Sequence, residues 1–102
     1  MITIPEGDKR DIIIDVSRLR GTGAITVATP QRRILDASRL LIAAFDWAAA
    51  TWDGAALELY TLFDSTAVGL TAVGTYYVQF RGTIGTEIYK AEVTVRVTEV
   101  GP

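Results

Sequence analysis

The stretch 86–97, T-E-I-Y-K-A-E-V-T-V-R-V, decides the fold class of this 102-residue chain. From its fourth residue onward, every second side chain is apolar: Tyr89, Ala91, Val93, Val95 and Val97. The side chains between them are polar or charged. Such strict alternation over eight or more residues is typical of a β-strand that buries one face and exposes the other. We therefore predict a strand over these residues.

The residues just before this strand predict its partner. Segment 75–81 alternates in the same way, with Tyr76, Val78 and Phe80 on one face and Tyr77, Gln79 and Arg81 on the other. A short glycine-containing spacer, 82–85, separates the two runs. Two alternating runs joined by such a spacer indicate a β-hairpin.

Two other segments show a similar pattern. The side chains expected to face the core are Ile12, Ile14 and Val16 in segment 11–16, and Leu57, Leu59, Thr61 and Phe63 in segment 56–63. A turn is expected at 20–23, followed by a short β-prone run at 24–28. Pro30 is expected to block a continuous central strand, because proline has no amide hydrogen to donate.

The middle of the chain admits two interpretations. Segment 36–52 has the chemistry of a helix, with Asp36 suited to cap its start and Gly54 suited to lie just past its end. Alternatively, segment 40–47 is a buried strand followed by an irregular alanine-rich connection. We expect Trp47 and Trp52 to belong to the core.

Composition excludes several classes of function. The chain has no Cys and no His, which excludes disulfides, thiol nucleophiles and histidine-based triads. Its formal net charge of −2 provides no basic excess for nucleic-acid binding. No apolar run reaches the roughly 18 residues of a membrane-spanning helix. The charged N-terminal residues do not fit a signal peptide, so we expect cytoplasmic synthesis.

The carboxylates offer the remaining candidate chemistry. A calcium loop could draw on Glu6, Asp8, Asp11 and Asp15. A solvated strand face, neutralised by the neighbouring Lys9 and Arg10, accounts for the same residues, and we predict no metal or cofactor. A glycosidase pair such as Asp46 and Asp53 would need a sugar-sized cleft that a domain of this length rarely provides. The chain is therefore predicted not to be an enzyme.

The polar face of the predicted hairpin is the candidate interaction surface. Tyr77, Gln79 and Arg81 share this face, and Glu92 and Arg96 lie near it on the second strand. Aromatic residues and arginine are enriched at protein interfaces. Ordinary cross-strand packing is the alternative explanation for the same residues. Apolar residues make up 49% of the chain, which suggests that a partner covers some apolar surface.

Segment 70–80, L-T-A-V-G-T-Y-Y-V-Q-F, resembles the L-x3-G-x-Y-x-V stretch of immunoglobulin-like sandwiches. The resemblance implies that the Tyr76 hydroxyl bonds to backbone a few residues upstream. Together with segment 6–14, E-G-D-K-R-D-I-I-I, the pattern is similar to small immunoglobulin-like proteins of tailed bacteriophages. Such proteins serve in tails, in baseplates or as capsid decorations. The Cys…Trp…Cys core of antibody domains is not matched, because the chain has no Cys, but Trp47 is a candidate for the central core tryptophan.

These observations lead to one set of expectations. Residues 1–102 form a single domain, mainly β, with the architecture of an immunoglobulin-like antiparallel β-sandwich; a helix at about 36–52 stays open, and α+β is the alternative class. The resemblance implies a structural or assembly protein of a phage-like particle, incorporated into a virion. It would act through contacts with itself or with other particle subunits, without nucleic acid or membrane. A carbohydrate- or ligand-binding module is the alternative function.

Overall fold

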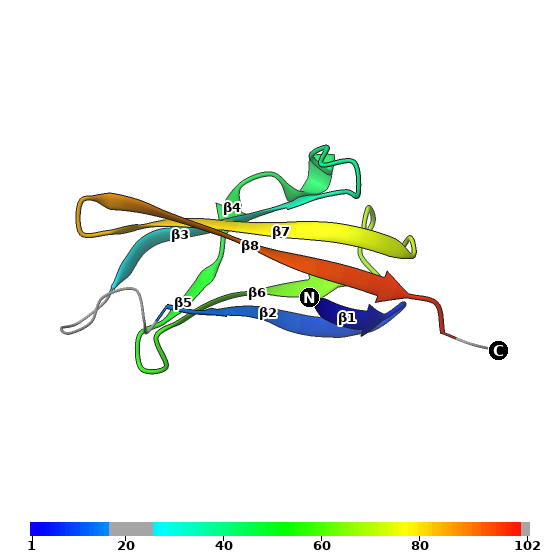
Figure 1. Cartoon of the computed structure of the whole chain (residues 1–102), viewed down its shortest axis with the longest axis horizontal. Helices are drawn as coiled ribbons and strands as arrows, with labels where there is room; N and C mark the ends of the chain where they lie inside the picture. The colour runs from blue at the N-terminus through cyan, green and yellow to red at the C-terminus, as the bar shows by residue number, and fades with distance from the viewer. Residues whose placement is uncertain (17–25, 101–102) are drawn as a thin grey trace.

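The computed structural model describes residues 1–16 and 26–100, which form two β-sheets packed face to face (Figure 1). The strands are β1 (Ile2–Pro5), β2 (Lys9–Asp15), β3 (Val27–Leu35), β4 (Ala48–Ala49), β5 (Thr51–Asp53), β6 (Glu58–Asp64), β7 (Gly74–Ile84) and β8 (Glu87–Thr98). The predicted β-sandwich is confirmed. The turn expected at 20–23 lies outside the described residues. No helix among the described residues is long and apolar enough to cross a membrane.

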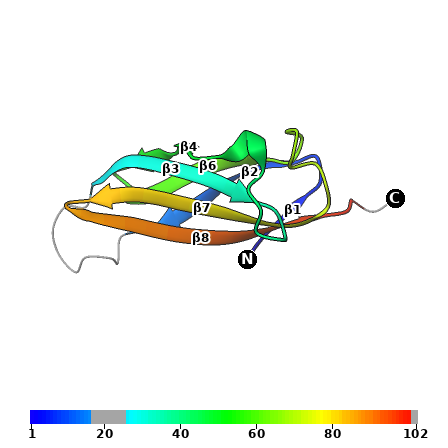
Figure 2. The ribbon, with the colours of Figure 1, turned by 90° about the horizontal axis from the view of Figure 1, so that it is seen from above.

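The strand order is that of an immunoglobulin-like sandwich. The larger sheet has the order β1-β8-β7-β3-β4 and the smaller sheet the order β2-β6-β5. The runs β8-β7-β3 and β2-β6-β5 correspond to strands G-F-C and B-E-D of that architecture. Figure 2 shows β8, β7 and β3 side by side in the larger sheet. One pair departs from the antiparallel expectation, because β1 runs parallel to β8.

The predicted hairpin is confirmed as β7 and β8, but its turn is shorter than expected. Pairing continues to Ile84 and Glu87, so Gly82 lies within β7 opposite Tyr89 and the turn begins at Gly85. Gly85 adopts a positive φ of 62°, which a two-residue hairpin turn requires. Gly82 has a different role, since a Cβ atom there would collide with the side chain of Val27 on the adjacent strand.

The core lies between the inner faces of the two sheets, as the alternation predicts. Its fully buried members come from both sheets and from the loop after β6: Ile4, Ile12, Ile34, Leu59, Phe63, Leu70, Val78, Val95 and Val97, with Tyr76 and Phe80 almost as buried. The core positions predicted in segments 11–16 and 56–63 include three of these residues. The period-two pattern therefore identified the buried faces of β2, β6, β7 and β8 correctly.

Pro30 interrupts the ladder of β3 without ending the strand. The register between β3 and β7 shifts between Ala28 and Gln31, where Pro30 and its neighbour Thr29 form a bulge. Thr29 has a positive φ of 52° at this point. A bulge leaves a residue out of the ladder, so the missing amide hydrogen of proline breaks no sheet bond.

The prediction of a helix at 36–52 is wrong, as is that of a buried strand at 40–47. The segment forms a turn after β3, a single 3₁₀ turn at Ala43–Phe45, the short strand β4 and then β5 in the other sheet. Leu40 and Leu41 are exposed. The chain must cross from one sheet to the other here. Pairing with β3 and β6 gives hydrogen-bond partners to the backbone of this segment, and this pairing overrides the local helix propensity.

Tyr76 closes one end of the sandwich. Its hydroxyl donates a hydrogen bond of 2.7 Å to the carbonyl oxygen of Ala72, as the sequence resemblance implies. Its ring is 5% exposed and packs edge-on against Phe63, with the ring centroids 5.5 Å apart. Burial raises the pKa of the Tyr76 hydroxyl above its ordinary value of 10.0, so the donor proton is present at neutral pH. This contact joins the loop before β7 to the core.

We predict that Tyr76→Phe lowers the free energy of unfolding by about 1 kcal/mol, the usual net contribution of one hydrogen bond. The ring packing stays, so the change reports the hydroxyl alone. Tyr60→Phe, on the outer face of β6, is the matched control and should change stability by less than about 0.5 kcal/mol. Urea unfolding measures both variants, and equal effects would contradict a special role for the Tyr76 hydroxyl.

Candidate functional site

The outer face of the larger sheet carries the predicted interaction residues. Because alternate residues of β7 point to opposite faces, the burial of Tyr76, Val78 and Phe80 turns Tyr77, Gln79 and Arg81 outward. The register places Gln79 opposite Glu92 of β8 on one side and opposite Arg33 of β3 on the other. The sheet therefore aligns three strands of polar side chains.

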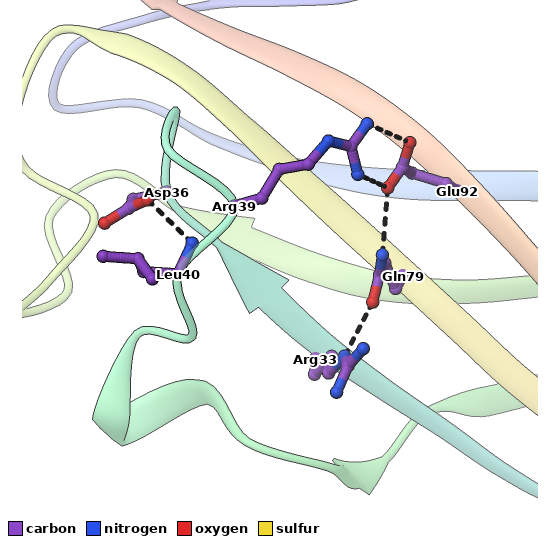
Figure 3. Close-up of polar contacts among 6 residues, drawn as sticks. All are labelled: Arg33, Asp36, Arg39, Leu40, Gln79 and Glu92. Atoms are coloured by element: carbon purple, nitrogen blue, oxygen red, sulfur yellow. Dashed lines mark hydrogen bonds and ion pairs between the residues drawn. The ribbon is translucent and has the colours of Figure 1, made fainter.

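A hydrogen-bonded chain of four side chains crosses this face, and we call it the polar ladder: Arg33, Gln79, Glu92 and Arg39 (Figure 3). Arg33 Nε donates to Gln79 Oε1 at 2.6 Å, and Gln79 Nε2 donates to Glu92 Oε1 at 3.0 Å. Arg39 donates to the same carboxylate from both of its terminal nitrogens, at 2.8 and 3.1 Å. Such a bidentate pair fixes orientation as well as charge.

The turn after β3 brings Arg39 onto this face. Asp36 Oδ1 accepts hydrogen bonds from the backbone amides of Ser38 and Leu40, at 2.8 and 3.0 Å. Arg39 adopts a left-handed φ of 62°, and the turn projects its side chain back across β7 (Figure 3). An aspartate that bonds to amides two and four residues later stabilises a tight turn. Asp36 is therefore a capping residue, but for a turn rather than the expected helix.

The electrostatics of the ladder favour its charged form. The hydrogen bonds from Arg39 and Gln79 hold the pKa of Glu92 below its ordinary value of 4.5. The hydrogen bond to Glu92 in turn raises the pKa of Arg39. The Arg39 guanidinium also lies over the Tyr77 ring, 4.1 Å from its centroid, in a cation–π arrangement. Both charges of the pair are thus present at neutral pH.

Trp47 lies on this outer face and not in the core, so its core assignment is wrong. The Arg81 guanidinium carbon lies 4.0 Å from the centroid of the Trp47 ring, and that of Arg33 lies 4.7 Å from it. Arg81 is held in place by a 2.7 Å bond from its Nε to Gln31 Oε1. Trp52, by contrast, is partly buried and packs against the core, as predicted.

The backbone before β4 determines the position of Trp47. Arg32 Nη1 donates to the carbonyl oxygen of Asp46 at 2.8 Å, and its guanidinium lies over the Phe45 ring. Asp46 Oδ1 accepts the Trp47 amide at 2.7 Å. The next residue, Ala48, pairs with Arg32 in the sheet. These contacts fix the segment against the edge of β3 and lay the indole across the outer face.

A groove of about 540 Å³ runs between Trp47 and β8. Its walls are formed by Arg33, Trp47, Gln79, Phe80, Arg81, Lys90, Ala91 and Glu92. Three of these side chains are cationic and one is a carboxylate. Lys90 is exposed and forms no ion pair within residues 1–16 and 26–100. The groove therefore suits a partner that supplies acceptor groups.

The structure brings together four of the five predicted surface residues. Tyr77, Gln79 and Glu92 belong to the ladder or contact it, and Arg81 contacts Trp47. Arg96 shares the face but lies nearer β1, opposite Thr75 and Thr3, outside the ladder.

Sequence reasoning missed Arg33, Arg39 and Trp47 as members of this surface. The alternation of β3 could have placed Arg33 on the outer face. No local signal indicated the other two.

Metal binding has no support in the described part of the chain. Within residues 1–16 and 26–100, no group of three or more acidic side chains is placed to hold a metal ion. Asp8 and Asp64 instead bond to nearby amides, and Asp64 also pairs with Lys9 at 3.9 Å. The four carboxylates considered for a calcium loop, Glu6, Asp8, Asp11 and Asp15, form no such group within these residues.

Comparison of the chain with protein-family models, curated proteins and solved structures finds no match in any of the three.

We predict that Glu92→Gln removes an acid-sensitive part of the stability. A carboxylate whose folded pKa is lowered stabilises the fold above its unfolded value of about 4.5, and this contribution is lost as the pH falls through the lower folded value. The variant should have a lower free energy of unfolding than the original chain at neutral pH, and this difference, the stability gap, should shrink in acid. Urea unfolding across pH, with Glu99→Gln as control, measures it. A gap independent of pH would contradict the role of the ionised carboxylate.

Proposed function

We propose that this domain is a non-enzymatic module that works through protein–protein contacts, and that the outer face around the polar ladder is its contact surface. The observation that carries the proposal is the pre-ordered arrangement of Arg33, Arg39, Arg81, Tyr77 and Trp47 on one exposed sheet face. Arginine, tyrosine and tryptophan are the residues that most often carry binding energy at interfaces.

Pre-ordering is what makes this face suited to binding. Long arginine side chains lose about 2 kcal/mol of rotamer freedom when a partner immobilises them. Here Arg33 is already tied to Gln79, Arg39 to Glu92 and Arg81 to Gln31. Each of these bonds uses only part of the guanidinium. A partner thus finds oriented donors whose ordering entropy the fold has already lost.

The chemistry of the face supports binding rather than catalysis. The carboxylate of the polar ladder, Glu92, accepts bonds from two side chains and has a lowered pKa, which opposes a role as proton donor. The sequence contains neither Cys nor His to act as nucleophile or base. The guanidinium groups remain charged at every physiological pH and suit the recognition of carboxylate or carbonyl oxygens.

The resemblance to small immunoglobulin-like proteins of tailed bacteriophages supports a more specific role in a particle. Segment 70–80 carries this resemblance, and proteins of that type act as tail, baseplate or capsid-decoration subunits. We extend the proposal accordingly: the domain is a structural or assembly subunit of a phage-like particle. A sandwich that presents ordered arginine and aromatic side chains on one face suits repeated contacts within such an assembly.

The groove beside Trp47 is the observation that favours the alternative, a carbohydrate- or ligand-binding module. Sugars bind to proteins largely by stacking on an open aromatic face. Two guanidinium groups lie over the Trp47 ring, at 4.0 and 4.7 Å from its centroid, and would compete with a sugar for that space. We therefore place the protein-contact proposal first.

We predict that a photo-crosslinking residue in place of Lys90 captures a specific protein partner in the cells or particles that naturally contain the chain. Lys90 borders the groove and is exposed, so the substitution leaves the ladder intact. Mass spectrometry of the adduct identifies the partner. The same residue at Val68, 87% exposed in the loop after β6, is the control and should give no adduct. No adduct at Lys90, or equal adducts at both positions, would overturn the proposal.

A further inference from the structure

The outer face of the smaller sheet differs in charge from the outer face of the larger one. In β2, β6 and β5 the inward positions are held by core residues such as Ile12, Leu59 and Trp52, so the register turns the alternate residues outward. The charged residues at these outward positions are Lys9, Asp11, Asp15, Asp53, Glu58 and Asp64. We call this surface the acidic face. It carries five carboxylates against one cation, a formal excess of four negative charges.

The larger sheet shows the opposite balance. Its outward strand positions and the Arg39 turn that covers them hold five cations and two carboxylates: Arg33, Arg39, Arg81, Lys90 and Arg96, with Glu92 and Asp36. We call this surface the basic face. It has a formal excess of three positive charges within a chain whose net charge is −2. The two faces thus have formal charges of opposite sign and similar size, and they lie on opposite sides of the sandwich.

The acidic face also has an apolar centre. Ile13 is 47% exposed and lies opposite Tyr60, and Leu62 is 52% exposed and lies opposite Asp11. An apolar patch surrounded by charges has the composition of an interface, with a hydrophobic centre and a polar rim. The basic face offers the complementary surface: the Trp47 groove surrounded by cations.

We infer that the partner of the basic face is a second copy of this chain, which presents its acidic face. This inference rests on the proposed function and names the partner. When two copies bind through unlike faces, the pair still presents one free acidic face and one free basic face. Further copies therefore add through the same contact. Such a heterologous contact generates a ring when the rotation closes and a filament when it does not.

Symmetric pairing through either face alone is opposed by charge. Two basic faces in contact would bring together two excesses of three positive charges, and two acidic faces would bring together two excesses of four negative charges. Like charges across an interface are strongly unfavourable. Contact between unlike faces instead pairs the guanidinium groups with carboxylates, the geometry that arginine binds best.

The expected contact is weak and sensitive to salt. With strands of seven residues or fewer, the three-stranded sheet spans about 24 by 14 Å, or about 340 Å² per copy and ~700 Å² in total. This area is below the ~1,200 Å² at which stable specific interfaces begin, and it fits a weak, transient contact. Exposed charges are screened within about 10 Å at ~0.1 M salt and within ~3 Å at ~1 M salt. Assembly should therefore be reversible and rise with protein concentration at low ionic strength.

The test uses two complementary variants of the full chain in sedimentation velocity. Lys90→Glu/Arg96→Glu removes the positive excess of the basic face, and Asp11→Lys/Glu58→Lys removes the negative excess of the acidic face. All four residues lie outside the core and the ladder. Concentrations extend to about 1 mM, since a contact with a Kd of ~1 mM is then substantially populated. Glu99→Lys changes a charge beyond both faces and serves as the control.

The inference predicts a specific pattern of outcomes. The original chain and the Glu99→Lys control should exceed the monomer mass of 11.1 kDa at low salt and return to it in high salt. Each double variant alone should stay monomeric, because one of its faces cannot bind. A 1:1 mixture of the two should stop at a dimer, through the one intact face of each. The chain that carries all four substitutions should bind neither variant, which excludes attraction by net charge alone.

Three results would overturn the inference: an original chain that stays monomeric at low salt, double variants that assemble as it does, or a mixture that forms no dimer. A monomeric original chain that still crosslinks at Lys90 to a different protein would reject self-assembly and leave the proposed contact surface standing. Failure of both experiments would reject the contact surface as well.

Discussion

The full-length pairing of β7 with β8 is the constraint on which both the core and the candidate site depend. All eleven residues of β7 pair with β8, and its other side pairs with β3. Because side chains alternate along a strand, burying Val78 and Phe80 obliges Gln79 and Arg81 to face outward. A slip of one residue would exchange the two sets. The free energy of core burial therefore holds the proposed contact surface in register.

The segment between β3 and β6 has two roles. It carries the chain from one sheet to the other, and it folds over the outer face on the way. Asp36 tightens its first turn, which delivers Arg39, and Arg32 anchors the end that delivers Trp47. A helix of the same residues would have buried its apolar stripe. It would have left the outer edge of β3 without the β4 pairing.

The ordered arginines and the division of charge have one physical origin. Each strand of a sandwich turns one face toward the core, so charged side chains collect on the two outward faces. Here the cations gather on one face and the carboxylates on the other, with Lys9 and Glu92 as the only exceptions among the charged strand residues that face outward. Glu92 is neutralised in place by Arg39. The side chains of the basic face are therefore ordered, and carboxylates of the same face neutralise only a small part of its positive charge. This fits a surface that contacts the carboxylates of a partner.

The sequence by itself determined the fold class, the hairpin and the buried faces of β2, β6, β7 and β8, because a period of two is a local property of neighbouring residues. It also identified Tyr77, Gln79, Arg81 and Glu92 as one surface, since they share the hairpin. Arg39 and Trp47 reach that surface through turns stabilised by contacts with β3 and β8, and no local pattern encodes those contacts. Only the tertiary structure could decide the path of segment 36–52, because strand pairing overrode its helical propensity. The opposition of the two charged faces also emerges only when the sheets are stacked.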